Sequence, residues 1–155
     1  MPEDETKDSS LNEEKLKVNY SKQGKKNRAS GARFELKVRK DLEEKGWTIA
    51  KWTNNIDLEK NQMIPAKRKY NPFFKALSVG TGFPDFVGIK AEKGDKKEVI
   101  GVEVKARGYL DKEEKEKCKF YLDKCVFSKI LIAKTIKNGR NINIEYIDFK
   151  AKYGK

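Results

Sequence analysis

Apolar residues recur along the chain with two different spacings, and each spacing predicts one kind of element. A spacing of three or four residues predicts amphipathic helices, whereas alternation of apolar and polar residues predicts strands. In chain order the pattern predicts a helix, a strand, a hairpin, a second helix and two final strands, over residues 30–45, 47–52, 79–108, 110–124, 128–136 and 141–147. This order is typical of an α/β domain with a central mixed β-sheet of about five strands flanked by helices.

The hairpin is predicted by two apolar, β-branched runs that are separated by a short charged turn. Side chains alternate between the faces of a strand, so Glu103 and Lys105 share one face and their valine neighbours share the other. Asp85 opens the partner strand after a loop that contains glycine and proline. Two carboxylates that converge beside an ammonium group are suited to holding a divalent cation and a water next to a phosphate.

The first helix is expected to begin at Ser30, whose side chain suits an N-cap, and to end at Gly46. Phe34 and the apolar residues four and eight positions later form a stripe that should face the core. Glu35 lies one position from this stripe. A glutamate on a lysine-rich helix is normally solvated, but this position also allows it to lie at the edge of the stripe, toward the sheet.

The ends of the chain differ from its centre in charge. Residues 1–15 contain six acidic and two basic residues, whereas residues 16–40 contain nine basic residues and one acidic residue. We therefore expect a disordered charged tail at 1–24, a folded domain at 25–150 and a frayed basic tail at 151–155.

The segment 54–82 has no regular apolar pattern, and we interpret it as a long loop with a short helical piece over 73–77. Long loops in compact domains are often functional. This segment contains the aromatic residues Tyr70, Phe73 and Phe74. Two interpretations stay open for them: a surface that stacks on or wedges open nucleic-acid bases, or a satellite core under the loop.

Charge narrows the functional classes. The 155 residues include 36 Lys and Arg against 24 Asp and Glu, a net charge of +12, which favours a polyanionic partner such as nucleic acid. A lysine- and glutamate-rich surface of the thermophilic kind accounts for the charge content but not for the imbalance and its clustering. The chain has no histidine, which excludes Ser-His-Asp catalysis, imidazole acid–base chemistry and His-ligated zinc.

Cysteine usage and hydropathy bear on the expected location. Cys118 and Cys125 are seven residues apart, which is two helical turns and too far for a disulfide, so both are expected in the core. This usage is compatible with a reducing cytoplasm, and no apolar run is long enough for a membrane span or a signal peptide. The expected location is cytoplasmic, with no membrane partner.

Three motifs together resemble the PD-(D/E)XK nuclease superfamily: Gly82-Phe-Pro-Asp85, Glu103-Val104-Lys105, and the upstream helix that carries Glu35. The resemblance implies a restriction-endonuclease-like core, and within the superfamily the chain is most similar to archaeal Holliday junction resolvases. It covers residues 29–147 as topology. Taken alone, each motif has a plainer explanation; a glutamate and a lysine on one strand face, for example, usually form a salt-bridge ladder.

The resemblance implies a function in DNA recombination or repair, with a role for each motif residue. Asp85 and Glu103 would bind Mg²⁺ or Mn²⁺, since carboxylate oxygens select hard cations, with the Val104 carbonyl as a further ligand. Lys105 would orient or help deprotonate the attacking water and stabilise the transition state. Glu35 would hold a second metal or a water in the outer shell.

Basic residues outside the motifs are expected to position the nucleic acid through phosphate contacts. The candidates are Arg28, Arg33, Lys67, Arg68, Lys69, Lys75 and Arg107. The resemblance also suggests a homodimer, because paired cuts across a four-way junction need two sites related by a twofold axis. The segment before Asp85 is longer than in the compact junction resolvases, which leaves junction, flap and duplex substrates open.

Two functions from different classes remain. The first is a metal-dependent endonuclease that hydrolyses DNA phosphodiester bonds, with selectivity for junctions or branched DNA as one version. The second is a non-catalytic nucleic-acid-binding protein on the same scaffold. The sequence does not decide between DNA and RNA.

Overall fold

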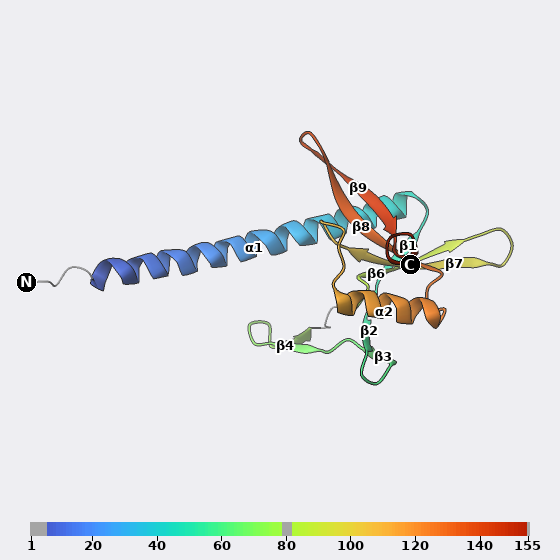
Figure 1. Cartoon of the computed structure of the whole chain (residues 1–155), viewed down its shortest axis with the longest axis horizontal. Helices are drawn as coiled ribbons and strands as arrows, with labels where there is room; N and C mark the ends of the chain where they lie inside the picture. Colours follow the sequence, from blue (N-terminus) through green and yellow to red (C-terminus); the bar gives the residue numbers. More distant parts are fainter. Residues whose placement is uncertain (1–5, 79–81, 155) are drawn as a thin grey trace, which may run out of the picture. The chain divides into compact units, whose positions relative to one another are not determined.

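The computed structural model describes residues 6–78 and 82–154, with side chains from Glu13 onward except those of Lys69 and Ser78 (Figure 1). The chain divides into two units, Met1–Leu36 and Lys37–Lys155. The helix α1, Thr6–Glu44, crosses the boundary between them. Within residues 6–78 and 82–154, no helix combines the length and the apolarity needed to cross a membrane.

A five-stranded sheet forms the centre of the second unit, with the strand order β1-β6-β7-β8-β9. The bounds of these strands are Thr48–Lys51, Phe86–Ala91, Lys97–Val104, Lys129–Asn138 and Asn141–Asp148. The pairing of β7 with β8 is parallel and the other three pairings are antiparallel. The predicted fold, an α/β domain with a mixed sheet of five strands flanked by helices, is therefore confirmed.

The first unit differs from its prediction. The sequence predicts a disordered tail over 1–24 and a helix that begins at Ser30, but the residues from Thr6 onward are already helical. The predicted helix start is therefore wrong, since Ser30 lies inside α1. Lysine, glutamate and leucine favour helix, and side-chain pairs four residues apart support it, such as the 3.1 Å hydrogen bond from Gln23 to Asn27.

The end of α1 follows the prediction. The helix ends at Glu44, and Gly46 takes a positive φ of 89°, as helix C-termini favour. On the last turns of the helix, Leu42 is buried, and Asp41 accepts a 2.6 Å hydrogen bond from the Tyr146 hydroxyl on β9. Burial, followed by the bond to Asp41, raises the pKa of Tyr146, so the phenol remains a donor.

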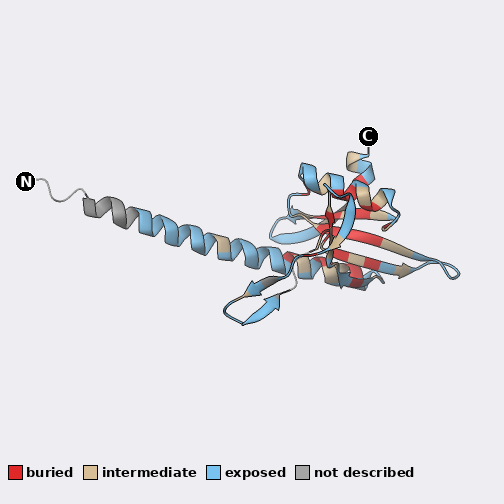
Figure 2. Ribbon diagram, turned by 90° about the horizontal axis from the view of Figure 1, so that it is seen from below, coloured by how far each residue is buried: buried red, intermediate tan, exposed pale blue. Residues whose placement is uncertain are grey.

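The main core lies between the sheet and α2, Lys112–Asp123. Cys118 and Tyr121 on this helix are fully buried. They pack with buried residues of the strands and loops, namely Ile56, Phe83, Leu110, Phe127, Ile130, Ile132 and Phe149. Figure 2 shows buried residues gathered along the central strands. Cys125 was expected to face inward, but it is exposed because α2 ends two residues earlier and the chain turns there with a φ of 54°.

The C-terminal segment also holds more structure than expected. Residues after Asp148 form the short helix α3, Phe149–Tyr153, where the sequence predicts a frayed tail from 151. The Asp148 carboxylate accepts from the backbone N–H groups of Lys150 and Ala151, which caps the helix. Phe149 is buried in the main core and anchors it.

Residues 79–81 of the predicted long loop 54–82 lie outside the described part of the chain. The described segment 54–78 is not a long loop, and its predicted helical piece at 73–77 is wrong. It forms two hairpins, with β2 at Asn54–Asp57, β3 at Gln62–Pro65, β4 at Lys69–Asn71 and β5 at Ala76–Ser78. Side chains that bond their own backbone make the turns. The Asp57 carboxylate accepts from two N–H groups at 3.1 Å, and the Asn71 side chain accepts from Phe73 at 3.0 Å.

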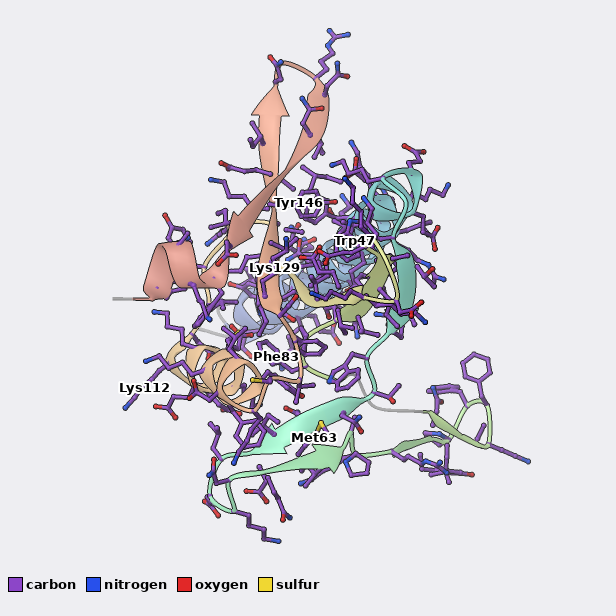
Figure 3. All side chains as sticks on the ribbon, turned by 90° about the vertical axis from the view of Figure 1, so that its right-hand side faces the viewer. Trp47, Met63, Phe83, Lys112, Lys129 and Tyr146 are labelled. Atoms are coloured by element: carbon purple, nitrogen blue, oxygen red, sulfur yellow. The ribbon has the colours of Figure 1, made fainter. Side chains whose placement is uncertain are left out.

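The segment that leads into β6 is held by the core helix. Tyr121 donates a 2.7 Å hydrogen bond to the carbonyl of Phe83 and accepts a 3.0 Å bond from the Trp52 indole. Phe83 lies beside α2 (Figure 3), with its N–H bonded to the Asn54 carbonyl. Gly82 has no room for a side chain, because a Cβ there would lie 2.2 Å from the Trp52 carbonyl oxygen. These contacts fix where Asp85, two residues after Phe83, is placed.

We expect Tyr121→Phe to destabilise the second unit by about 1–3 kcal/mol, because the change leaves the Phe83 carbonyl and the Trp52 indole without this partner in the core. Urea unfolding of the full chain measures the effect. Tyr109→Phe is the matched control, since Tyr109 is exposed and loses only a surface hydroxyl. Equal stability of the two variants would contradict the role assigned to Tyr121.

Candidate active site

Asp85, the residue before β6, lies opposite Glu103 on β7. The register pairs Phe86 with Val102, so the next position along brings Asp85 opposite Glu103 on the face that α2 covers. Each carboxylate accepts from the backbone of the other strand. Glu103 Oε2 accepts from the Asp85 N–H at 3.1 Å, and Asp85 Oδ2 accepts from the Val104 N–H at 2.8 Å. The two acids are thereby fixed relative to each other.

Lys105, which follows directly after β7, is the third member of the group and pairs with Glu103. Its ammonium nitrogen lies 3.4 Å from Glu103 Oε1 and 2.5 Å from Glu114 Oε1. Burial alone would lower the pKa of Lys105, but the hydrogen bond to Glu114 and the charge of Glu103 together raise it. Lys105 therefore stays a cation at neutral pH, which suits it to stabilising negative charge and not to accepting a proton.

Glu114 is part of this group, and the sequence analysis missed it. It is the third residue of α2, and its side chain accepts from the backbone N–H of the N-cap Asp111 at 2.9 Å. Asp111 accepts in turn from the Glu114 N–H at 2.8 Å, which makes a capping box. The spacing Asp-x-x-Glu before a helix is a recognisable signal for this box. The cap fixes the carboxylate that holds Lys105.

The burial of Glu103 determines the electrostatics of the site. Its side chain is in the core with 5% of the residue exposed. Burial first, and then the charge of Asp85, raise the pKa of Glu103 to about 8, despite the opposing effect of Lys105. Burial of the Cys118 side chain itself, followed by the charges of Glu103 and Glu114, raises the pKa of its thiol, which therefore stays protonated and is not a nucleophile.

The donors fit a hard divalent cation that keeps most of its water. Among residues 6–78 and 82–154, no group of three or more Asp, Glu or Cys side chains is placed to hold an ion by itself. Mg²⁺ in proteins commonly binds through one or two carboxylates, with water and phosphate oxygens completing the coordination. Asp85 and Glu103 meet this requirement, and a cation between them would offset the repulsion that raises the pKa of Glu103.

The structure brings four of the predicted site residues together. Asp85, Glu103, Val104 and Lys105 form one group in the second unit. Glu35 is half-buried and belongs to the first unit, as do the exposed residues Arg28 and Arg33. The other basic candidates belong to the second unit. Those whose side chains are described are exposed, namely Lys67, Arg68, Lys75 and Arg107, and the side chain of Lys69 lies outside the described part.

Comparison with known protein families, curated proteins and solved structures gives no match for this chain. The resemblance to PD-(D/E)XK nucleases therefore rests on Asp85, Glu103 and Lys105 and on the order of the elements around them. The chemistry of the site is inferred from its own geometry.

The raised pKa of Glu103 predicts that stability falls as pH rises. Below its ordinary value of 4.5 the carboxyl is protonated in both the folded and the unfolded chain. Between 4.5 and about 8 only the unfolded chain releases this proton, so the folded state loses stability across this window. We expect the loss to be on the order of 3 kcal/mol between pH 5 and pH 8.

Glu103→Gln should remove this loss, because the amide keeps the shape and an acceptor oxygen but does not ionise. The measurement is urea unfolding of both proteins in EDTA at several pH values. Glu98→Gln is the matched control on the same strand, since Glu98 is paired with Lys129 near the surface. A stability difference between wild type and Glu103→Gln that does not change with pH would contradict the assigned burial.

Proposed function

We propose that the chain is a divalent-cation-dependent endonuclease of the PD-(D/E)XK kind, acting on DNA. The observation that carries the proposal is the group formed by Asp85, Glu103 and Lys105 on one face of two paired strands. Burying the Glu103 carboxyl beside the half-buried Asp85 costs stability, so such a pair is better explained by chemistry than by folding. The basic charge of the chain supports a polyanionic substrate.

The residues of the group take different roles in this proposal. Asp85 and Glu103 would hold Mg²⁺ or Mn²⁺, which when bound supplies neutralisation of phosphate charge and a more acidic water. Lys105 stabilises the negative charge that builds on the phosphate as water attacks in line. Glu114 orients Lys105 through the 2.5 Å bond and keeps it protonated. Lys105 is thus proposed as an electrostatic group, and not as the base.

Substrate binding is proposed to use the exposed basic residues. Lys67, Arg68, Lys75 and Arg107 lie in the same unit as the acidic pair, and Arg28 and Arg33 supply basic charge in the first unit. Such contacts bind phosphates without reading sequence. Branched DNA and a homodimer, both suggested by the resemblance, remain proposals. The edge strand β9 would supply the dimer surface, since its Ile142 side chain is an apolar group that is 45% exposed.

One observation favours a second function. Lys105 is engaged by both Glu103 and Glu114, and such an ion cluster also occurs as a purely structural feature. The alternative is therefore a non-catalytic nucleic-acid-binding protein on the same scaffold. Cleavage assays distinguish the two functions directly.

Asp85→Asn should lower cleavage by at least about 100-fold while DNA binding measured in EDTA stays nearly unchanged, because it removes a metal ligand and no phosphate contact. The assay uses labelled four-way junction, flap, duplex and single-stranded DNA, with Mg²⁺, Mn²⁺ or EDTA. Asp95→Asn is the matched control, since Asp95 is exposed in the β6–β7 turn. Full activity of Asp85→Asn, or cleavage that persists in EDTA, would refute the proposed site; binding without cleavage by the wild type would support the non-catalytic alternative.

Binding to duplex DNA should weaken steeply with salt, because each neutralised phosphate releases condensed cations. Replacing Lys67, Arg68 and Lys75 by glutamine should reduce the slope of log affinity against log salt by up to about 3. A second triple variant of Lys93, Lys96 and Lys97 removes the same charge elsewhere on the surface and should change the slope less. Equal slopes for the two variants would mean that only net charge matters.

A further inference from the structure

The hairpin of β4 and β5 displays large apolar side chains to solvent. Phe73 is 93% exposed and Phe74 80% exposed, and Tyr70 and Leu77 behind them are 61% and 60% exposed. The hairpin projects away from the five-stranded sheet (Figures 1 and 3). Of the two interpretations that the sequence leaves open, the satellite core is wrong, because the three aromatic side chains remain 61–93% exposed within the described part of the chain.

The backbone of the hairpin holds these side chains in a defined arrangement. Tyr70 and Leu77 pair across the strands and therefore share one face. At the tip, Asn71 accepts a 3.0 Å hydrogen bond from the Phe73 N–H, and Lys75 takes a positive φ of 46° that closes the turn. The tip is thus a built turn that presents two adjacent phenylalanines, not a loose coil.

Folding gains nothing from these rings in their exposed positions. Each aromatic side chain would bury roughly 150–250 Å² if a partner covered it, and it is this burial that stabilises. A cluster of exposed aromatic residues on a soluble surface is typical of a binding site. The rings are therefore best explained by a ligand that covers them.

The charge around the hairpin identifies the chemistry of that ligand. Residues 61–84 contain four basic residues and no acidic residue. Lys67, Arg68 and Lys75 are exposed beside the aromatic cluster. A ligand that combines negative charge with flat apolar faces satisfies both features, and nucleic-acid bases on their phosphate backbone have this combination.

Only some nucleic acids offer such faces. Inside a duplex each base is stacked on its neighbours, so aromatic rings can reach a base face only at a branch point, an end or a single-stranded segment. We propose that the β4–β5 hairpin is a stacking surface for unpaired or terminal bases, which makes the chain selective for branched or partly single-stranded nucleic acid. The inference rests on the proposed function for the identity of the polymer, but it needs no catalysis.

The test is a binding measurement in EDTA, with the wild-type chain and the double variant Phe73→Leu/Phe74→Leu. Leucine keeps apolar bulk and removes the aromatic faces. The probes are a four-way junction and a tailed duplex, each with 2-aminopurine at the branch, and a blunt duplex of equal length. Met63→Ala is the matched control, because Met63 is an exposed apolar residue on the β2–β3 hairpin. A Phe73→Trp/Phe74→Trp variant tests rescue.

We expect the leucine variant to bind both branched probes about 10-fold more weakly and to lose the 2-aminopurine signal, since one stacked base contributes about 5-fold or more. Its affinity for the blunt duplex should stay within about 2-fold of wild type, since phosphate contacts remain, and the tryptophan variant should bind like wild type. Equal affinity of leucine variant and wild type for the branched probes, or an equal loss on all three, overturns the inference.

Two further measurements distinguish other occupants. If wild type but not the leucine variant binds vesicles of anionic phospholipid, and both bind DNA alike, the surface serves a membrane and the inference is wrong. The same holds if sedimentation shows a wild-type dimer that the leucine variant lacks, again with unchanged DNA binding. Failure of the proposed function is separate, since it appears as absence of metal-dependent cleavage whatever the hairpin binds.

Discussion

The buried carboxyl group of Glu103 is the constraint on which the second unit is built. An acid in the core is costly unless its oxygens are paired, and here one oxygen accepts from the Asp85 backbone while the other faces Lys105. The Asp85 donor depends on the alignment of β6 and β7, whereas Lys105 lies two residues after Glu103 on the same segment. A shift of one residue in that register would turn Asp85 away and leave Glu103 without its backbone donor.

The packing around the pair maintains this register. Tyr121 reaches from α2 to the Phe83 carbonyl, two residues before Asp85, so the helix and the start of β6 are tied together. Gly101 allows the same close approach from β7, because a Cβ there would lie 2.9 Å from Pro84 and 3.0 Å from the Phe127 ring. The packing of the core therefore determines where the residues of the site lie.

Much of this could be predicted because it depends on local patterns. The apolar alternation of the β6–β7 hairpin predicts the facing positions of Asp85 and Glu103, and the spacing within α2 predicts the burial of Tyr121. The features that the sequence analysis missed depend on specific hydrogen bonds, which the apolar pattern does not show. The hairpins within 54–78 arise from side chains such as Asn71 that bond their own backbone, in strands too short to show alternation. The role of Glu114 depends on its bond to Lys105, nine residues earlier, across the turn between β7 and α2, which no apolar pattern shows.

The charge of the site is opposite to that of the chain. Glu103 and Glu114 both pair with the Lys105 ammonium and Asp85 lies beside Glu103, so acidic groups gather at this spot on a protein that carries a net charge of +12. For the proposed nuclease, the basic surface would attract DNA while the acids would repel the phosphate that must react. A divalent cation would remove that repulsion, and the phosphate would in turn supply oxygen ligands that the two carboxylates lack. Because such coupling is reciprocal, cation and DNA should each strengthen the binding of the other at this site.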